Sequence, residues 1–351
     1  MTMTKTLASI VTEQKYPALG TSDDGPSMSR AMQWLANQGV QRKEAVELDL
    51  EGLRYICETT AEVSRFGDFT FGTKSGGTIQ SNLDWGPFPT ADEARNRCHL
   101  EFTAGDRAKL GHPLRITGPH SDMEPNKSPG YVLEQQCAAW FKSVTVVEAI
   151  GQDLDHIWGD FIDIGFDAKD PRRTTKAVII PGRWSRCGRV GFNAGGTCSG
   201  LDFSCDGTPN SYIERCPGDI IHCEIQGAGG FKDWNVHDVV AKQNFRAHIT
   251  GMNFCENLNI HNCLGTEFYV MVKPADGQRM KGPFYLQANH WTNPGGGLCD
   301  VYKCDQAVVS GNVGPVPKRL PLVSLDPSAD GAIHLVNCPR PVVNADGLER
   351  V

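Results

Sequence analysis

The feature that most constrains this chain is a short pattern that recurs four times between residues 256 and 346. Each copy consists of an apolar residue, any residue, a second apolar residue, two further residues and then Asn or Cys. The closing residues lie 26, 23 and 26 positions apart. The four copies are Leu258, Ile260 and Cys263; Phe284, Leu286 and Asn289; Ala307, Val309 and Asn312; and Ile333, Leu335 and Cys338.

Alternation of apolar residues predicts short strands in which every second side chain faces inward. The Asn or Cys that follows marks a tight corner. A period in the twenties with almost no helical pattern is typical of a solenoid, and the leucines of leucine-rich repeats are missing from these positions. We therefore expect an all-β protein, a parallel β-helix, in which Ile260, Leu286, Val309 and Leu335 form one column. A β-sandwich with accidental spacing is the alternative.

The charge and hydrophobicity of the chain restrict the kinds of partner that it can bind. The net charge of -7 argues against a nucleic acid held through its phosphates and against a polybasic membrane contact. No stretch of about eighteen apolar residues is present, so no membrane insertion is expected. The first residues, MTMTKTLASIVTEQ, lack the apolar core of a signal peptide, which predicts synthesis in a cytoplasm without export by the general route.

Two regions are expected along the chain. Residues 1–16 begin with a polar, unpatterned stretch and predict a flexible arm or docking tail. Residues 17–351 predict one β-helix domain, since a solenoid grows by adding coils and need not divide. An amphipathic helix over about residues 22–38 would cover the open end of the coil, because capping residues precede apolar residues at helical spacing. These apolar residues are Met28, Ala31, Met32 and Leu35.

The chain has 13 cysteines, but none forms the CxxC pairs of a zinc knuckle. A disulfide framework would suit a small secreted domain, which this chain does not resemble. Cys263 and Cys338 share a repeat position with two asparagines and predict small, buried corner residues. The sequence gives no indication of a metal or cofactor. Four histidines, His156, His222, His261 and His290, do not lie at metal-pair spacing with one another. We expect them at outward or corner positions.

Alternation in the middle of the chain also predicts which side chains face the core. The inward set is Ile162, Ile164, Val178, Ile180, Val190, Phe192, Leu201 and Phe203. The outward set is Phe161, Asp163, Arg189, Asn193, Asp202 and Ser204.

The densest carboxylate region lies at residues 153–170. Glycoside hydrolysis needs two carboxyl groups about 5–10 Å apart, and Asp163 and Asp202 would meet this distance on neighbouring outer strands. A lyase would need a base and often calcium, for which Asp160, Asp163 and Arg189 would supply parts. Asp160, Asp163 and Asp202 are thus the candidate catalytic residues. The plainer alternative is that these carboxylates only keep a solenoid soluble.

A carbohydrate-binding surface would instead expose flat aromatic rings beside amides and charges. Alternation places Tyr269 and Lys273 on the outside of one strand and Tyr285 and Gln287 on the outside of another, with Trp291 at a corner. These five residues are the candidate ligand-binding set. The alternative is that they pack against a neighbouring subunit.

Several segments resemble a known superfamily. GTSDDGPSMSRAMQWLA (20–36), LDLEGLRYIC (48–57) and GGTIQ (76–80) resemble the opening of pectate-lyase-like right-handed parallel β-helix proteins. LRITGPH (114–120), LEQQ (133–136), WGDFIDIG (158–165) and the Asn/Cys coils are similar to the β-helix minor tail proteins of actinobacterial phages. At LDFSCDG (201–207) the chain lacks the acidic residue that the resemblance implies near Ser204, which counts against catalysis.

The resemblance implies right-handed winding, a place in a phage tail and frequent trimers. The last coil would end without a capping helix, so we also expect a partner to cover it. The favoured hypothesis is a homo-oligomeric tail protein of the virion, made in the host cytoplasm, that contacts other tail proteins and host cell-surface polysaccharide. The alternatives are a polysaccharide hydrolase or lyase of a tail or a bacterium, and a bacterial cytoplasmic β-helix.

Overall fold

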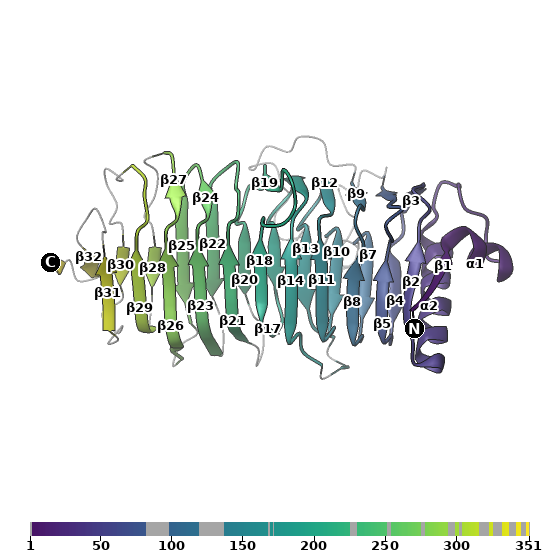
Figure 1. Cartoon of the computed structure of the whole chain (residues 1–351), viewed down its shortest axis with the longest axis horizontal. Coiled ribbons are helices and arrows are strands. Elements are labelled where there is room, and N and C mark those ends of the chain that lie inside the picture. Colours follow the sequence, from purple (N-terminus) through teal and green to yellow (C-terminus); the bar gives the residue numbers. More distant parts are fainter. Residues whose placement is uncertain are drawn as a thin grey trace, which may run out of the picture.

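A computed structural model describes residues 2–81, 98–118, 137–167, 169–170, 172–224, 230–250, 254–274, 278–293, 299–301, 304–315, 323–325, 332–336, 342–344 and 349–350. Across these residues the chain is mostly β-strand, with two helices, α1 (Leu7–Glu13) and α2 (Gly25–Arg42). The strands stack along one long axis, and both helices lie at the N-terminal end of the stack (Figure 1).

The largest sheet in the described part of the chain, sheet A, has 13 strands. In spatial order these are β1 (Thr2–Thr6), β2 (Ala45–Asp49), β5 (Asp68–Phe71), β8 (Arg107–Leu110), β11 (Val146–Ile150), β14 (Lys176–Ile180), β18 (Leu201–Ser204), β21 (Gly230–His237), β23 (Phe254–His261), β26 (Met280–Gln287), β29 (Cys304–Ser310) and β31 (Ala332–Val336), with β17 (Cys198–Ser199) also on β21.

Two more large sheets accompany it. Sheet B consists of β3 (Arg54–Ile56), β6 (Thr78–Gln80), β9 (Arg115–Thr117), β12 (Asp153–Ile157), β15 (Arg183–Cys187) and β19 (Tyr212–Glu214). Sheet C consists of β4 (Ala61–Ser64), β7 (Leu100–Thr103), β10 (Ala139–Lys142), β13 (Ile162–Gly165), β16 (Phe192–Ala194), β20 (Ile221–Glu224), β22 (Phe245–Thr250), β25 (Phe268–Lys273), β28 (Cys299–Val301), β30 (Val323–Leu325), β32 (Val342–Asn344) and β33 (Glu349–Arg350). A small sheet D pairs β24 (Leu264–Gly265) with β27 (His290–Trp291).

The chain visits the large sheets in a fixed order. From β2 to β20 it passes through sheets A, B and C in turn, and each strand pairs in parallel with the strand one circuit earlier. After β20 sheet B gives way to the short sheet D and to bridges such as Val240↔Leu264. In the described residues the only antiparallel pair is β32 with β33. The architecture is all-β and solenoid-like, as the repeat predicts.

The register confirms the predicted column of apolar side chains. Ile260 pairs with Leu286, Leu286 with Val309, and Val309 with Leu335. The first three of these side chains are buried. Because parallel pairing repeats the same position in each circuit, one apolar residue per coil is enough to continue the core.

The corner after this column depends on side-chain amides. The left-handed residue is the one before the predicted Asn or Cys, namely Asn262, Ala288 and Gly311. Asn289 is fully buried and donates through Nδ2 to the oxygen of Ile260 at 3.1 Å and to Oδ1 of Asn312 at 2.9 Å. Asn289 and Asn312 are therefore buried links between coils and do not themselves adopt the left-handed conformation.

Aromatic rings and thiols fill the rest of the core. Phe102 stacks on Phe141 with ring centroids 5.1 Å apart, and Phe245 stacks on Phe268 at 4.5 Å. Each pair occupies one register position in successive strands of sheet C. The 12 cysteines in the described part of the chain, Cys263 among them, are all buried and form no disulfide bond. Cys338 lies outside the described residues.

The N-terminal residues do not form the flexible arm that their polarity predicts. Thr2–Thr6 is strand β1, which pairs with Ala45–Asp49 and covers the first edge of sheet A. Alternating threonines favour a strand, and the Thr6 side chain then caps α1 by accepting a hydrogen bond from the Ser9 N–H. Leu7, Ile10 and Val11 anchor α1 because they lie on one helical face and are buried.

The helix expected over about residues 22–38 is α2, Gly25–Arg42. It packs close to β2, since a Cβ on Gly39 would lie 2.6 Å from Val46 Cγ1. The acidic pair before the helix ties it to sheet B: Asp24 Oδ2 accepts from the Ile56 N–H at 3.1 Å and Asp23 Oδ1 from the Glu58 N–H at 3.0 Å.

The predicted facing is wrong for three residues. Ala177 and Ile179 are fully buried, whereas Val178 and Ile180 are only partly buried. Four consecutive apolar residues carry no signal that fixes which alternate pair faces inward. Phe161 was expected outside but is fully buried against Trp184, with ring centroids 5.3 Å apart, because it lies at a corner just before β13.

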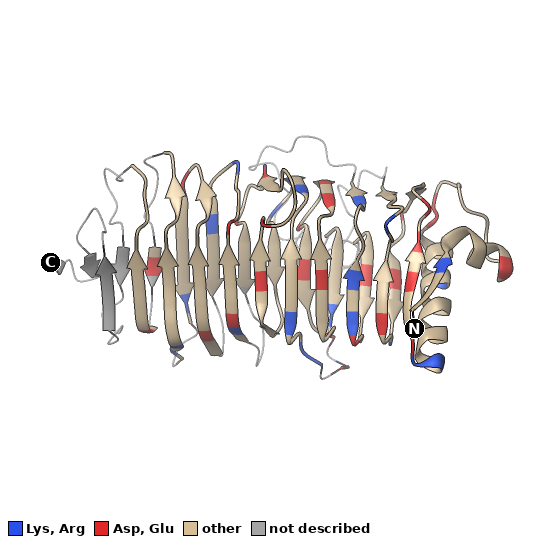
Figure 2. Cartoon of the chain, in the orientation of Figure 1, with Lys and Arg blue, Asp and Glu red and all other residues tan. Residues whose placement is uncertain are grey.

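Charged residues of both signs are interspersed along the strands in the view of Figure 2. Neither described helix is long and apolar enough to cross a membrane.

Candidate functional site

The outer face of sheet B carries two parallel columns of polar side chains. The register places Arg115, Asp153, Arg183 and Tyr212 in the first column, and Thr117, Asp155, Ser185 and Glu214 in the second. Neighbouring members of a column are about 4.8 Å apart, the spacing of paired strands. We call these two columns the sheet B ladder.

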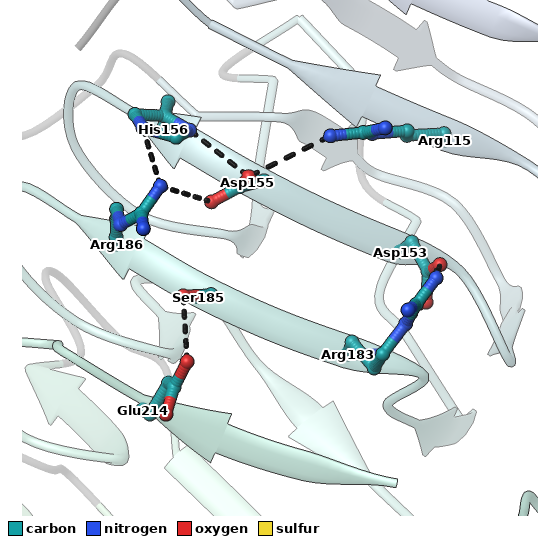
Figure 3. Close-up of polar contacts among 8 residues, drawn as sticks. All are labelled: Arg115, Asp153, Asp155, His156, Arg183, Ser185, Arg186 and Glu214. Atoms are coloured by element: carbon teal, nitrogen blue, oxygen red, sulfur yellow. Dashed lines mark hydrogen bonds and ion pairs between the residues drawn. The ribbon is translucent and has the colours of Figure 1, made fainter. Parts of the chain in front are cut away.

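Ion pairs and hydrogen bonds connect successive steps of the ladder (Figure 3). The Arg183 N–H donates to Asp153 Oδ1 at 2.9 Å, and its guanidinium also binds Asp153 through Nε at 3.1 Å to Oδ2. The Ser185 hydroxyl donates to Glu214 Oε1 at 3.0 Å. The hydrogen bond and charge of Asp153 raise the pKa of Arg183 above its usual range. These contacts orient the side chains before any ligand binds.

Asp155 is the centre of the second group in Figure 3. It lies 3.7 Å from Arg115 Nη2, 3.9 Å from Arg186 Nη1 and 3.0 Å from His156 Nδ1. Arg186 Nη1 donates to His156 Nε2 at 2.7 Å. The tautomer that carries its hydrogen on Nδ1 satisfies both contacts of His156.

His156 and Arg186 occupy a strained backbone position. Their φ angles are 57° and 63°, and the equivalent residue of the next coil, Arg215, has 55°. A left-handed conformation costs a non-glycine residue on the order of 1 kcal/mol. Because this conformation recurs in successive coils, it adds outward side chains beside the ladder at a regular spacing.

The ladder lines an open cleft of about 240 Å³ whose walls are Arg115, Asp153, Asp155, Arg183, Ser185, Arg186, Tyr212 and Glu214. The Tyr212 ring lies beneath Lys242, whose Nζ is 3.2 Å from the ring centroid. Burial and the nearby Glu214 raise the pKa of Tyr212, so its hydroxyl keeps its proton at neutral pH. Planar guanidinium and carboxylate groups beside an aromatic ring can bind the hydroxyl groups and flat faces of sugars.

A second polar cluster lies where sheet B turns into sheet C. Arg189 holds the fully buried Asp160 by two hydrogen bonds, at 2.8 and 2.6 Å. Asp163 is only 4% exposed. Burial and the charge of Asp160 raise the pKa of Asp163 to about 7, against the opposing effects of Arg189 and Asn193. At neutral pH Asp163 is therefore about half protonated, and a carboxyl group with a raised pKa is what a general acid requires.

The structure brings Asp160, Asp163 and Arg189 together as expected, but Asp202 is remote from them. Asp163 is on β13 of sheet C, whereas Asp202 is on β18 of sheet A. The Asp202 side chain is 49% exposed and lies 2.8 Å from His237 Nε2. The expectation that Asp163 and Asp202 stand on neighbouring strands is therefore wrong, since the turns between them assign them to different sheets.

The five candidate ligand-binding residues do not form one surface. Tyr269 and Lys273 are on β25 of sheet C, and the Tyr269 hydroxyl bonds to Asp300. Tyr285 and Gln287 are on β26 of sheet A. Trp291 is only 2% exposed and donates from Nε1 to the Pro315 oxygen at 2.9 Å.

Sequence reasoning missed the ladder residues Arg115, Arg183, Tyr212 and Glu214. Their strands have only three to five residues, too few for a clear alternating pattern. One signal was present in the chain, because Asp153 and Arg183 are 30 residues apart, one full coil in this region.

Comparisons with known proteins identify no similar protein. The sequence matches no protein-family model, and neither the curated proteins nor the solved structures give a match.

Proposed function

We propose that the chain is a right-handed parallel β-helix and a receptor-binding protein of a phage tail that contacts host cell-envelope glycan. The winding is supported by the ordered passage through sheets A, B and C, because parallel strands joined by a crossover are right-handed in about 98% of cases. The pectate-lyase-like segments and their similarity to actinobacterial phage tail proteins support the tail context.

The observation that carries the glycan proposal is the sheet B ladder. It offers hydrogen-bond donors, acceptors and one aromatic ring along an open cleft, repeated at the spacing of the coils. Its charges are mostly paired with each other, as in Asp153 with Arg183, so the surface suits a hydroxyl-rich chain better than a polyanion. An extended polysaccharide would lie along the stack and bind several coils at once.

Adsorption to host cells tests this proposal. We expect the purified chain to bind intact cells of an actinobacterial host and to reduce adsorption of the matching phage. Arg183→Ala should weaken both effects, whereas Lys176→Ala, an exposed change on sheet A, should not. Equal binding by wild type and Arg183→Ala, or no binding to any host envelope, would refute the assignment.

The virion location and the oligomer are tested separately. Mass spectrometry of purified virions should detect the chain among the tail proteins. Light scattering should give a mass of three chains, because the resemblance to phage tail proteins implies trimers and an open sheet edge favours association with another copy. A monodisperse monomer would remove the trimer from the proposal.

One observation favours the alternative of a polysaccharide hydrolase or lyase, namely the raised pKa of the buried Asp163 beside the Asp160–Arg189 pair. Against it, neither carboxyl group is open to a substrate. Incubation of the chain with envelope polysaccharide should yield no new reducing ends or unsaturated products. Products that disappear in Asp163→Ala would establish the enzyme and overturn the non-enzymatic proposal.

A further inference from the structure

The outer face of sheet C carries two histidines in successive coils. His222 on β20 pairs in register with His248 on β22, and Asn193 on β16 precedes them in the same column. The two imidazole rings meet edge to face, with centroids 5.5 Å apart. Asp219 lies at the corner just before β20, where its backbone oxygen accepts from the Gly191 N–H at 3.0 Å.

The carboxylate of Asp219 lies between these two rings. Its Oδ2 is 3.0 Å from His222 Nδ1 and 3.6 Å from His248 Nδ1. One possible ligand atom from each of the three residues lies within 4.8 Å of the other two. Metal–nitrogen and metal–oxygen bonds of about 2.0–2.2 Å require ligand atoms somewhat closer than this, so small side-chain rotations would close the site.

The two histidines keep the pKa of the Asp219 carboxyl group low. Burial alone would raise the pKa of Asp219, but hydrogen bonds from His222 and His248 more than offset it and lower the pKa to about 2. The Arg189 charge opposes a further cation here, and Asp160 neutralises that charge through its two hydrogen bonds.

We propose that Asp219, His222 and His248 bind a divalent first-row transition-metal ion, with Zn²⁺ as the reference ion. Two imidazoles and one carboxylate favour this class over Ca²⁺ or Mg²⁺, which prefer oxygen ligands alone. The ion would join two successive coils, since His222 and His248 belong to adjacent strands. His248 is 36% exposed, so a remaining coordination position faces solvent and is open to water or a ligand group.

Titration of the metal-stripped, tag-free full chain with Zn²⁺ tests this site. Calorimetry should show one ion per chain, and His248→Ala should weaken binding at least about tenfold, since even the loss of an outer-shell partner costs about 10–100-fold. His237→Ala is the matched control, because it removes a histidine that also contacts two carboxylates, those of Asp202 and Asp238. Circular dichroism checks that each variant is folded.

The Co²⁺-loaded chain provides a second readout that does not depend on folding energy. Its visible absorption should indicate nitrogen and oxygen ligands and should change in Asp219→Asn and in His248→Ala but not in His237→Ala. Zn²⁺ should also raise the melting temperature of the wild type and not of His248→Ala. No Zn²⁺ binding by the wild type, or equal binding by His248→Ala and His237→Ala, would overturn the proposal.

Discussion

The guanidinium of Arg189 donates two hydrogen bonds to the fully buried carboxylate of Asp160, from Nε to Oδ1 at 2.8 Å and from Nη2 to Oδ2 at 2.6 Å. The Val190 N–H donates to the same Oδ1 at 3.3 Å. This pair fixes the corner between sheets B and C, on which both the ladder and the histidine column are built.

Arg189→Ala should destabilise the chain by about 3–5 kcal/mol, because it leaves a buried carboxylate without its counter-charge. Denaturant unfolding measures this change. Arg183→Ala is the control: it removes an arginine whose side chain is 62% exposed, and its pair with Asp153 should contribute less than about 1 kcal/mol. An equal loss of unfolding free energy in the two variants would contradict the claim that burial makes the Arg189–Asp160 pair more important for stability than the exposed pair.

Asn289→Ala should also be destabilising. It leaves the Cys263 N–H and the Ile260 oxygen without their side-chain partner in the core, at about 1–3 kcal/mol for each buried group. Asn259→Ala removes an outward amide that donates to Asn235 Oδ1 at 3.0 Å, and should cost less than about 1 kcal/mol. Thermal unfolding of both variants compares them, and similar melting temperatures would show that the buried amides do not hold the corner.

Repeating side chains explain which parts of this architecture can be predicted from sequence. The column through Ile260 and Leu286 is predictable because one apolar residue recurs per coil at the same position of each paired strand. The facing of Val178 and Ile180 is not, since the run of apolar residues has no alternation. The N-terminal strand is missed because β1 is stabilised by pairing with β2, a contact that is distant in sequence.

The site was harder to predict than the fold. Asp160, Asp163 and Arg189 are found as a group because the first two lie at or just before the start of β13 and Arg189 lies just before β16, the next strand of sheet C. Asp163 and Asp202 are separated because the turns between them place their strands in different sheets. The amino-acid composition does not predict the sheet to which each strand belongs. The left-handed residues His156 and Arg186 carry no glycine or asparagine signal, so their outward side chains cannot be placed from sequence.

Asp163 predicts a dependence of stability on pH. Burial and the charge of Asp160 raise its folded pKa to about 7, above the usual 3.8, so the folded state binds more protons than the unfolded state between these values. Stability from this group is complete below about pH 4 and falls as the pH rises through 7. Asp163→Asn removes this titrating group. The melting temperature of the variant minus that of the wild type should therefore increase as the pH rises from about 4 to 7.

The control for this experiment is Asp106→Asn, which removes one negative charge from a side chain that is 75% exposed. Its difference from the wild type should stay flat between pH 4 and 7. A flat difference for Asp163→Asn as well would mean that Asp163 is not protonated in the folded chain.

The buried cysteines should be unreactive in the folded chain. Burial raises the pKa of Cys198 to about 12 and also raises the pKa of Cys263, so little thiolate forms at neutral pH. In a Cys338→Ser variant, which leaves the 12 described thiols, a thiol reagent should label fewer than one group per chain until denaturant is added. Rapid labelling of several thiols under native conditions would contradict the packing of the core.

The binding of purified envelope polysaccharide to Tyr212→Ala and Tyr285→Ala, measured by calorimetry against the wild type, tests the glycan proposal most directly. Loss of the ring in the sheet B cleft should weaken binding roughly tenfold, about 1.4 kcal/mol, while the sheet A tyrosine should not matter. Undiminished affinity in Tyr212→Ala, or an equal loss in both variants, would contradict a glycan site on sheet B.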